Sequence, residues 1–431
     1  MAGAPKKVLI YPCGTEIALE ILKATRYSRF YTLYGGSCSR DHGRFAFARH
    51  LDKLPFIRDG DPEEAVRQFN ERIRPYKFDF IYPAMDGVLT VFARYRHCLD
   101  PVVIAPPYET AAITRSKLKT YQTFRDLLPL PEIFATAAEV TKFPVFLKPA
   151  VGQGAVGTLK VDDAESLRLN QQDGDGRLIL EYLPGREYTI DCFTNARGRL
   201  IYCKGRSRDR IKNGISVSTA PCERSEFKRY AEIINSTLTQ RGGWFFQMRE
   251  DSQGELKLLE IASRIAGSSA LHRALGVNLP LLTLDIFNGV EIDSLALNDC
   301  EPELDRALHN SYRLNLEYES VYVDFDDTLV LHGQVNVELL AFLYQCLNRG
   351  KKLILLSRHE GPLAEELQKY RLLGLFDEVI QIPHDAAKAD CIKHGAGAIF
   401  IDDSYGERKA VQEALHIPVF DPAMIEALMM P

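Results

Sequence analysis

Six acidic or polar positions in the last quarter of the sequence have the types and spacing needed for phosphate chemistry. They are Asp324, Asp326, Ser357, Lys388, Asp402 and Asp403. The acidic pairs and the serine end or follow predicted strands, where open parallel sheets gather ligands, and the lysine lies near the start of a predicted helix. Carboxylates from two strands suit Mg²⁺, and a carboxylate can act as a nucleophile when cations offset the crowded negative charge. This pattern predicts a phosphoryl-transfer site.

A glycine-rich stretch, Lys148-Pro-Ala-Val-Gly152-Gln-Gly154-Ala-Val-Gly157, joins two further predicted strands. Such a loop can lay backbone N–H groups against phosphates, although on its own the pattern is more typical of a tight hairpin turn. It is neither a P-loop nor the dinucleotide-binding glycine motif, which disfavours a P-loop NTPase and a Rossmann dehydrogenase. Its flanking segments offer a candidate for each requirement of bound ATP: cations, a backbone edge, a ribose carboxylate and Mg²⁺ ligands.

A basic residue occupies every second position from Lys204 to Lys212. On one strand these side chains would share a face, because side chains alternate. The face could be a solvated, charge-protected edge. It could also bind an anionic substrate or ATP phosphates through Arg206, Arg208 and Arg210.

The elements that must position these residues fall into three segments. The first ~110 residues alternate apolar runs with amphipathic stretches, as in βαβ units, and from Pro144 short strands joined by glycine turns predict mostly antiparallel pairing. After a polar stretch, a second βα alternation begins near Asn315 to Glu319. We predict a multidomain α/β and α+β protein, with domains at 1–110, 111–316 (lid subdomain about 140–182) and 317–431.

Composition narrows the function classes. The 431 residues carry 58 carboxylates against 53 Lys plus Arg, so no global basic field points to nucleic acid. No apolar run reaches ~18 residues and no secretory signal is apparent, so we expect neither a membrane span nor export and place the protein in the cytoplasm. The nine cysteines are odd in number and scattered, which predicts mostly buried thiols. We interpret His42, His272 and His359 as surface or structural residues.

The C-terminal motifs, in their order, resemble those of the haloacid dehalogenase (HAD) superfamily of phosphotransferases over roughly Ser320 to Pro431. The resemblance implies a doubly wound α/β domain with a minimal cap, leaving the site open to a large substrate or covered by the N-terminal domains. Many members have glycine where this chain has Asp327. The alternative is a catalytically inactive docking domain. The implied roles are as follows: Asp324 as nucleophile, Asp326 as general acid/base, Ser357 and Lys388 as phosphoryl-binding residues, and Asp324, the Asp326 carbonyl and Asp402 or Asp403 as Mg²⁺ ligands.

The segment Lys6 to Glu291 resembles the ATP-grasp superfamily, in the branch of carbamoyl-phosphate synthases and biotin carboxylase-like ligases, with a pre-ATP-grasp α/β domain first. The resemblance implies ATP and Mg²⁺ (or Mn²⁺) as cofactors. It also implies ATP contacts at Lys117, Lys148, Gly152, Gly154, Gly157, Glu181, Leu183 and Glu187, with Glu181 and Leu183 as the adenine hinge and Glu187 on the ribose. Gln247 and Glu260 would be metal ligands, and Arg264 would contact the reacting phosphoryl group or acyl phosphate. The family usually has Asn where this chain has Ala262, which leaves fewer metal ligands.

Together the motifs predict a bifunctional enzyme. Its ligase half would activate a carboxylate as an acyl phosphate for attack by an amine, and its phosphatase half would act on a phosphorylated metabolite. Two alternatives stay open: an ATP-grasp kinase or acyl-phosphate synthase that forms no C–N bond, and a non-catalytic nucleotide-binding scaffold. The expected partners are small carboxylate and amine substrates, without nucleic acid or membrane, and the chain is a candidate homodimer.

Overall fold

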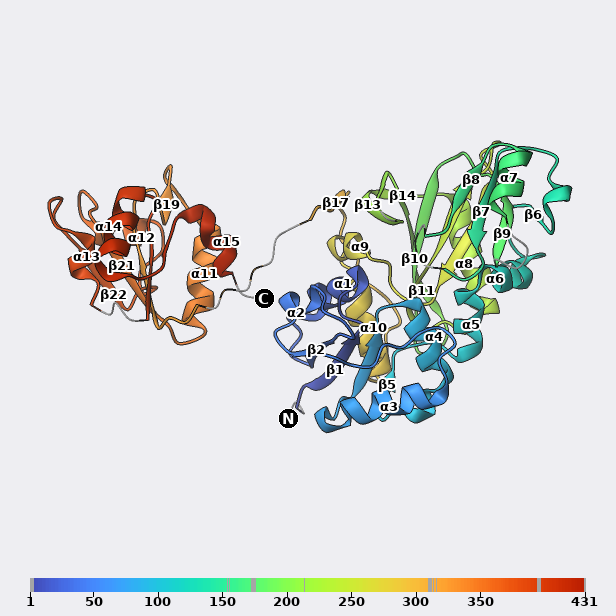
Figure 1. Ribbon diagram of the computed structural model, residues 1–431, viewed down its shortest axis with the longest axis horizontal. Coiled ribbons are helices and arrows are strands. Elements are labelled where there is room, and N and C mark those ends of the chain that lie inside the picture. The colour runs from blue at the N-terminus through green and yellow to red at the C-terminus, as the bar shows by residue number, and fades with distance from the viewer. Residues whose placement is uncertain are drawn as a thin grey trace. The chain divides into compact units, whose positions relative to one another are not determined.

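The computed structural model describes residues 4–152, 154, 156–171, 176–212, 214–308, 312, 314, 316–393 and 397–429. The chain divides into two compact units, Met1–Ala307 and Leu308–Pro431 (Figure 1). Each unit has its own sheets and its own buried apolar clusters. Of the predicted domain boundary, Asn315 lies outside the described residues.

The first unit begins with a parallel sheet in the order β3-β2-β1-β4-β5. Its strands are β1 Lys6–Tyr11, β2 Tyr31–Gly36, β3 His50–Leu51, β4 Phe80–Pro83 and β5 Val102–Val103. The connecting helices are α1 Glu16–Thr25, α2 Gly43–Ala46, α3 Glu63–Ile73, α4 Asp86–Arg94 and α5 Tyr108–Arg115, with short 3₁₀ turns η1 Arg74–Tyr76 and η2 Arg96–Cys98. Alternate residues of β1 enter two different apolar clusters. Both faces of the sheet are therefore buried, which explains the continuous apolar run in β1.

A small antiparallel sheet in the order β6-β9-β7-β8 carries the glycine-rich stretch. Its strands are β6 Ile133–Phe134, β7 Val145–Pro149, β8 Leu159–Val161 and β9 Arg177–Glu181. They are accompanied by α6 Lys117–Phe124, η3 Ala137–Glu139 and α7 Ala164–Asn170. The glycine-rich stretch connects β7 to β8, as the sequence predicts, and two of its residues, 153 and 155, lie outside the described part of the chain.

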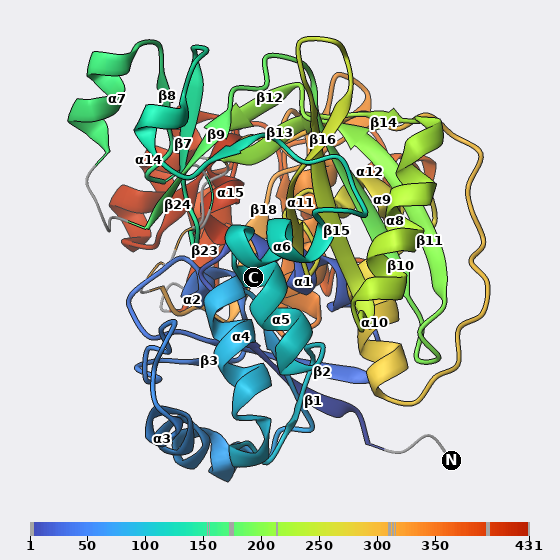
Figure 2. The same ribbon diagram turned by 90° about the vertical axis from the view of Figure 1, so that its right-hand side faces the viewer.

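A second antiparallel sheet, in the order β14-β11-β10-β15-β16, forms the centre of the first unit. Its strands are β10 Glu187–Thr194, β11 Leu200–Ser207, β14 Pro221–Cys222, β15 Gly242–Glu250 and β16 Leu256–Ala262. Helix α8 Ser225–Thr237 packs against β10 and β11 (Figure 2), and α9 Ala270–Ala274 and α10 Leu279–Phe287 follow. Trp244, which is the sequence's single tryptophan and 1% exposed, donates from Nε1 to Thr194 Oγ1 at 2.8 Å inside this core.

The prediction of one basic strand from Lys204 to Lys212 is wrong. β11 ends at Ser207, and β12 Arg210–Lys212 belongs to a different sheet, in the order β12-β13-β17, with β13 Ile215–Thr219 and β17 Leu304–Asp305. Between the two strands, the N–H of Asp209 donates to the Ser218 carbonyl of β13 at 3.1 Å. The basic side chains therefore do not share one face.

The second unit contains a parallel sheet in the order β22-β21-β18-β23-β24. Its strands are β18 Ser320–Val323, β21 Lys352–Ser357, β22 Glu378–Gln381, β23 Ala398–Ile401 and β24 Val419–Phe420, and a short hairpin, β19 Val330–Leu331 with β20 Gln334–Val335, follows β18. The helices are α11 Val337–Leu347, α12 Leu363–Lys369, α13 Lys388–Cys391, α14 Tyr405–Leu415, η4 Pro422–Met424 and α15 Ile425–Leu428. Successive residues of the central strands enter two separate apolar clusters, so both faces of this sheet are covered.

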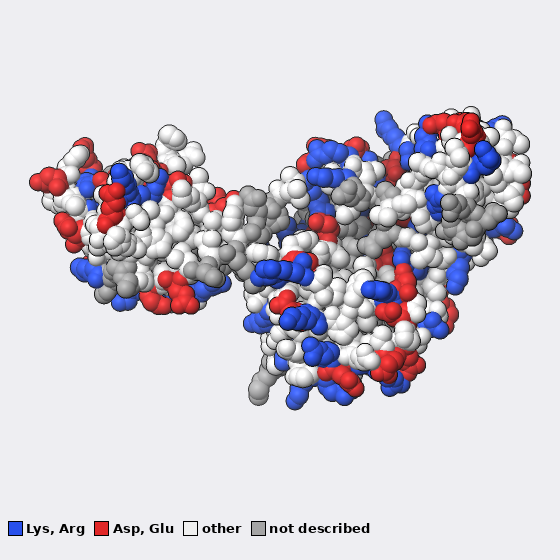
Figure 3. All heavy atoms as spheres, in the orientation of Figure 1, with Lys and Arg blue, Asp and Glu red and all other residues white. Residues whose placement is uncertain are grey.

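Surface charge is mixed. Acidic and basic side chains are interspersed on the face shown in Figure 3. Among the described residues, no helix combines the length and apolar character needed to cross a lipid bilayer.

Candidate active sites

A pocket of about 200 Å³ lies where the glycine-loop sheet faces the central sheet. Its walls include the apolar side chains of Phe146, Leu180 and Leu259, which suit a flat heterocycle such as adenine. Seven residues that the sequence assigned to nucleotide or metal binding line it: Lys148, Gly154, Glu181, Leu183, Glu187, Gln247 and Glu260. Segments more than 100 residues apart in sequence thus converge on one cavity. We refer to it as the nucleotide pocket.

Glu260 lies among cations at one end of this pocket. Its Oε2 is 3.7 Å from Lys148 Nζ and 3.8 Å from Lys117 Nζ. Burial alone would raise the pKa of Glu260, but the two lysines, with Arg264 and Arg208, hold it below its usual range. Burial lowers the pKa of the Lys117 ammonium, which Glu260 partly counteracts. The charge balance here is positive, as a site for a polyphosphate requires.

Gln247 and Glu260 face each other on paired strands, because β15 and β16 form a hairpin whose register places them opposite. With its amide oriented to satisfy both neighbours, Gln247 donates to Glu260 Oε1 at 3.2 Å and accepts from Arg208 Nη1 at 3.1 Å. Glu187, the predicted ribose ligand, pairs with Arg208 Nε at 2.7 Å and lies 3.8 Å from Arg249 Nη1. Neighbouring side chains therefore hold both the predicted metal ligand Gln247 and the predicted ribose ligand Glu187 in place.

Two of the three glycines of the glycine-rich stretch, Gly152 and Gly157, lie outside the lining of this pocket. The carbonyl of Gly152 accepts a hydrogen bond from Arg115 Nη1 at 2.7 Å, and Arg115 also pairs with Asp59 in the turn between β3 and α3. Gly157 has φ +76°, and a Cβ there would lie 2.9 Å from Pro149 Cγ, so its lack of a side chain is required. Sequence reasoning missed Arg115, which stands beside the predicted Lys117 but carries no motif of its own.

A neighbouring pocket, also about 200 Å³, shares five lining residues with the nucleotide pocket: Gly154, Arg208, Gly214, Gln247 and Glu260. Its other walls come from the start of α1 (Thr15, Glu16) and from the segment after β16, including Arg264 and Ser268. We refer to it as the acceptor pocket. A ligand here would lie beside a ligand in the nucleotide pocket.

Two arginines, Arg206 and Arg264, line the acceptor pocket but not the nucleotide pocket. Arg264 donates to Asp86 Oδ2 at 2.6 Å and to the Ile265 carbonyl at 3.0 Å. Arg206 is 1% exposed and pairs through Nε with Asp191 Oδ2 at 2.7 Å, while its buried Nη1 has no hydrogen-bond partner among the described residues. A buried donor without a partner, on a residue that lines a cavity, favours an anionic ligand.

The three arginines that the sequence predicts as an anion-binding set do not lie together. Arg206 and Arg208 reach the acceptor pocket, whereas Arg210 is exposed, pairs with Asp305 at 2.8 Å and lines neither pocket. Sequence reasoning did not identify Asp191, which holds Arg206 in place through an ion pair. Burial would raise the pKa of Asp191, but Arg206 and His272 lower it to about 2.

His272 is buried, as a structural histidine would be. Its Nε2 is 2.9 Å from Asp191 Oδ2 and its Nδ1 is 2.9 Å from the Tyr202 hydroxyl. Asp191 thus lies between a guanidinium and an imidazole, 81 residues from the latter in sequence.

The second unit brings its predicted acidic residues to one edge of its sheet. Asp324 and Asp402 directly follow the adjacent strands β18 and β23, and Lys388 opens α13. Lys388 Nζ lies 2.8 Å from Asp324 Oδ1 and 2.7 Å from Asp402 Oδ2. Burial raises the pKa of Asp324 to about 6 despite the lysine, and burial also raises the pKa of Asp402. One oxygen each of Asp324, Asp402 and Asp403 lie within 4.8 Å of one another.

The remaining three predicted residues of this site differ from one another in their exposure and in their contacts. Ser357 is buried, and its hydroxyl has no hydrogen-bond partner in the described chain. Asp403 is exposed, and its Oδ1 accepts from Thr328 Oγ1 at 3.1 Å. Asp326 is exposed and its carboxylate oxygens lie 2.9 and 3.0 Å from His359 Nδ1. His359 therefore contacts a predicted catalytic residue, which its sequence position two residues after Ser357 could have indicated.

Asp327 has φ +53°, in the left-handed region. Aspartate tolerates this conformation better than most residues, although glycine adopts it at less cost. The backbone thus accounts for a position where the sequence resemblance expects glycine.

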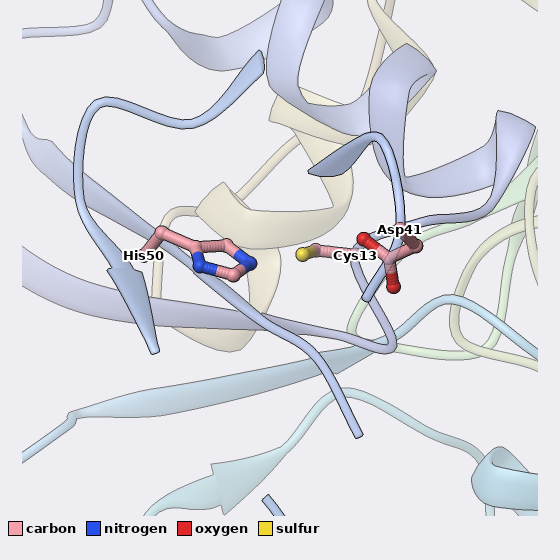
Figure 4. Close-up of side chains that lie close together, drawn as sticks. All are labelled: Cys13, Asp41 and His50. Carbon is pink, nitrogen blue, oxygen red and sulfur yellow. The ribbon is translucent and has the colours of Figure 1, made fainter. Parts of the chain in front are cut away.

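Two further groups of metal-binding side chain types lie in the first unit: Cys13 with Asp41 and His50, and Glu63 with His97 and Cys98. Cys13, Asp41 and His50 point toward one another (Figure 4), within 4.8 Å. The hydroxyl of Ser37 lies between them, donating to Asp41 Oδ1 at 2.9 Å and 3.0 Å from both Cys13 Sγ and His50 Nε2. Burial raises the pKa of the Cys13 thiol to about 12. These groups form a closed hydrogen-bond network around the serine.

Comparison with known proteins places this geometry in context. A family model described as "ATP-grasp in the biosynthetic pathway with Ter operon" matches residues 175–304. The biotin carboxylase domain of Hydrogenobacter thermophilus 2-oxoglutarate carboxylase is similar in structure, with TM-score 0.56 and 16% identity over 69% of this chain and 73% of that one. The first unit has an ATP-grasp fold.

Two further solved structures agree with this fold. Staphylococcus aureus N5-carboxyaminoimidazole synthetase complexed with ADP has TM-score 0.55 and 13% identity, covering 69% of this chain and 81% of that one. Bacillus licheniformis L-amino acid ligase has TM-score 0.51 and 20% identity, covering 66% and 74%. Among curated protein sequences, none matches this chain. Residues 317–431 lie outside the segment that the family model matches, so their phosphatase assignment stays a prediction.

Proposed function

We propose that this chain is a bifunctional enzyme, in which an ATP- and Mg²⁺-dependent carboxylate–amine ligase is joined to an aspartate-nucleophile phosphatase. In domain terms, residues 1–110 and 111–316 form the ligase and residues 317–431 a HAD-like phosphatase. The observation that carries the ligase is the pair of adjoining pockets, one lined by cations and apolar walls and the other by arginines, with a common border. Transfer of a phosphoryl group between two bound molecules needs this adjacency.

In the ligase reaction, a carboxylate in the acceptor pocket attacks the γ-phosphorus of ATP, forming an acyl phosphate and releasing ADP. An amine then attacks the acyl carbon, an amide bond forms and phosphate leaves. Lys117 and Lys148 offset the charge of the nucleotide phosphates, and Arg206 and Arg264 bind the acceptor. The protein contributes positioning and charge neutralisation.

Mg²⁺ fits the nucleotide pocket because Mg²⁺ is usually held by one or two carboxylates together with substrate phosphates. Glu260 supplies the carboxylate, and Gln247 offers a neutral amide beside it. When bound, the ion draws charge from the β- and γ-phosphates. The carboxylase domain noted above was solved with Mg-ADP and the synthetase with ADP, which supports ATP and Mg²⁺ as the cofactors here.

The phosphatase proposal is carried by the two buried carboxylates that share one lysine. A carboxylate oxygen of Asp324 attacks phosphorus, and Asp326 protonates the leaving group and then deprotonates the water that hydrolyses the aspartyl phosphate. Ser357 and Lys388 bind the phosphoryl oxygens. Asp324, the carbonyl of Asp326, and Asp402 or Asp403 would hold Mg²⁺, which offsets the negative charge when bound.

The expected partners are small molecules: an acid, an amine and a phosphorylated metabolite. The carboxylase domain is described as a dimer, which supports a homodimer as part of this proposal. Light scattering on the purified chain measures this directly.

The two halves are tested together by incubating the protein with ATP, Mg²⁺ and a library of acids and amines, and following ADP and new masses. The wild type should release ADP with an amide product. Glu260→Ala should lose ADP release, and unchanged release would make the metal assignment wrong. A phosphorylated product that accumulates only in Asp324→Asn would show that the halves act in sequence. ATP binding without ADP release for any substrate would instead indicate a scaffold.

A further inference from the structure

Arg208 occupies a place that no other described cation shares. Of the residues lining both pockets, it is the one with a positive side chain. Arg249 and Lys148 line the nucleotide pocket alone, while Arg206 and Arg264 line the acceptor pocket alone. A group that crosses from one pocket to the other must therefore pass Arg208.

The guanidinium of Arg208 is buried and held in place. The side chain is 7% exposed, and its Nε pairs with Glu187 at 2.7 Å. Nη2 donates to the Gly214 carbonyl at 2.9 Å, and Nη1 donates to the Gln247 amide oxygen at 3.1 Å and is 3.4 Å from Thr189 Oγ1. A guanidinium has five N–H donors, and the hydrogen bonds to Gly214, Gln247 and Thr189 use three of them. Nε has no hydrogen-bond partner among the described residues despite its ion pair with Glu187, so donors remain for a ligand.

This rigidity comes from the local backbone. Arg208 lies in the two-residue gap between β11 and β12, where the chain leaves the central sheet for the small sheet. Its side chain lines the acceptor pocket together with Arg206 and extends to the nucleotide pocket as well. Its charge is therefore fixed before any ligand binds, which lowers the reorganisation that stabilising a transition state requires.

In phosphoryl transfer, negative charge is spread over the three equatorial oxygens while the phosphorus lies between donor and acceptor oxygens. A cation confined to one pocket contacts the phosphoryl group before or after transfer. A cation at the border contacts it throughout. Glu260, the other charged residue at the border, is negative and repels the group unless a cation intervenes.

We infer that Arg208 is a catalytic residue that binds the γ-phosphoryl group of ATP and stays in contact with it during transfer to the acceptor. The inference rests on the proposed function. It separates Arg208 from Arg264, whose guanidinium is bonded to Asp86 and the Ile265 carbonyl within the acceptor pocket.

The test compares the affinities of the intact chain for Mg-ADP and for the non-hydrolysable Mg-AMP-PNP by calorimetry. Arg208→Met should weaken AMP-PNP binding about 10- to 100-fold, as expected for loss of a charge-assisted hydrogen bond in a buried site, and change ADP binding by less than about threefold. Arg249→Met is the matched control, because Arg249 also contacts Glu187 but lines only the nucleotide pocket. It should leave the ratio of the two affinities unchanged.

Arg208→Lys guards against loss of the fold, since it keeps the charge beside Glu187 while removing the planar fork. It should also weaken AMP-PNP binding more than ADP binding. Equal losses for both nucleotides in Arg208→Lys would mean that Arg208 only supports Glu187, and a wild-type ratio in both Arg208 variants would overturn the inference as well. Failure of the wild type to bind either nucleotide would overturn the proposed ATP use itself, which is a different result.

Discussion

In the first unit one carboxylate, Glu260, faces Lys117, Lys148 and two arginines, whereas in the second unit Asp324 and Asp402 share the ammonium of Lys388. The pKa values move in opposite directions as a result. That of Glu260 is lowered, and those of Asp324 and Asp402 are raised. The first site has spare positive charge and suits an anionic ligand, while the second has spare negative charge and suits a cation.

The largest effect on activity is expected from removing Asp324, the predicted nucleophile of the second site. Asp324→Asn should lower hydrolysis of an aryl phosphate by about 10⁴-fold or more, because the residual rate would come from binding alone. Initial rates with Mg²⁺ measure it. Asp390→Asn, an exposed carboxylate of the same unit, serves as control and should keep wild-type activity. A wild-type rate in Asp324→Asn would show that another group attacks phosphorus.

Lys388→Met removes the positive charge that Asp324 and Asp402 share in the second site. It leaves two buried carboxylates without their common cation, so the free energy of unfolding of this unit at pH 7 should fall by about 3–5 kcal/mol. Urea unfolding followed by circular dichroism measures the loss. Lys369→Met removes an exposed lysine that pairs with Glu366 and should cost far less. Equal losses for the two variants would contradict the ion-pair geometry.

Glu260→Gln changes the first site in the opposite sense. Substrate-dependent ADP release should fall by about 10²- to 10³-fold. ADP binding without Mg²⁺ should instead tighten about fivefold, since a repulsive carboxylate is removed from among the cations. Titration calorimetry with and without Mg²⁺ distinguishes the two effects. Glu255→Gln, an exposed residue between the same two strands, should change neither, and weaker metal-free binding in Glu260→Gln would contradict the charge balance described here.

The smallest expected effect is a pH dependence. The pKa of Asp324 is about 6 in the folded chain, above the ordinary value of 3.8, so the folded state retains a proton that the unfolded state loses. Its contribution to stability is complete below about pH 4 and is lost as pH rises through 6, amounting to about 1 kcal/mol between pH 5 and 7. Urea unfolding without metal measures this loss. Asp324→Asn should flatten that part of the profile, and a variant whose profile matched the wild type would show that Asp324 keeps its ordinary pKa.

The sequence predicts those parts of the sites that depend on local pairing. Gln247 and Glu260 meet because one hairpin sets their register, and Asp324 and Asp402 meet because parallel strands end at the same edge. In both cases the apolar runs and the polar residues that follow them carry the information. Strand identity was therefore enough to bring the residues together.

Contacts made between distant segments were not predictable in the same way. Asp191 meets His272, 81 residues away, through packing that no periodicity encodes. The alternating basic residues also failed as a guide, because alternation cannot show that the chain changes sheets at Asp209. Although Arg206 and Arg208 belong to the same alternating series, Arg206 pairs with Asp191 and Arg208 pairs with Glu187.

Trp244 gives the molecule an internal reporter. The chain's single tryptophan is buried in the central sheet of the first unit, with its indole N–H bonded to Thr194. Its fluorescence therefore follows the melting of the first unit alone, while the second unit unfolds without a tryptophan signal. In the intact, unlabelled chain, emission and far-ultraviolet dichroism recorded together would separate the stabilities of the two units.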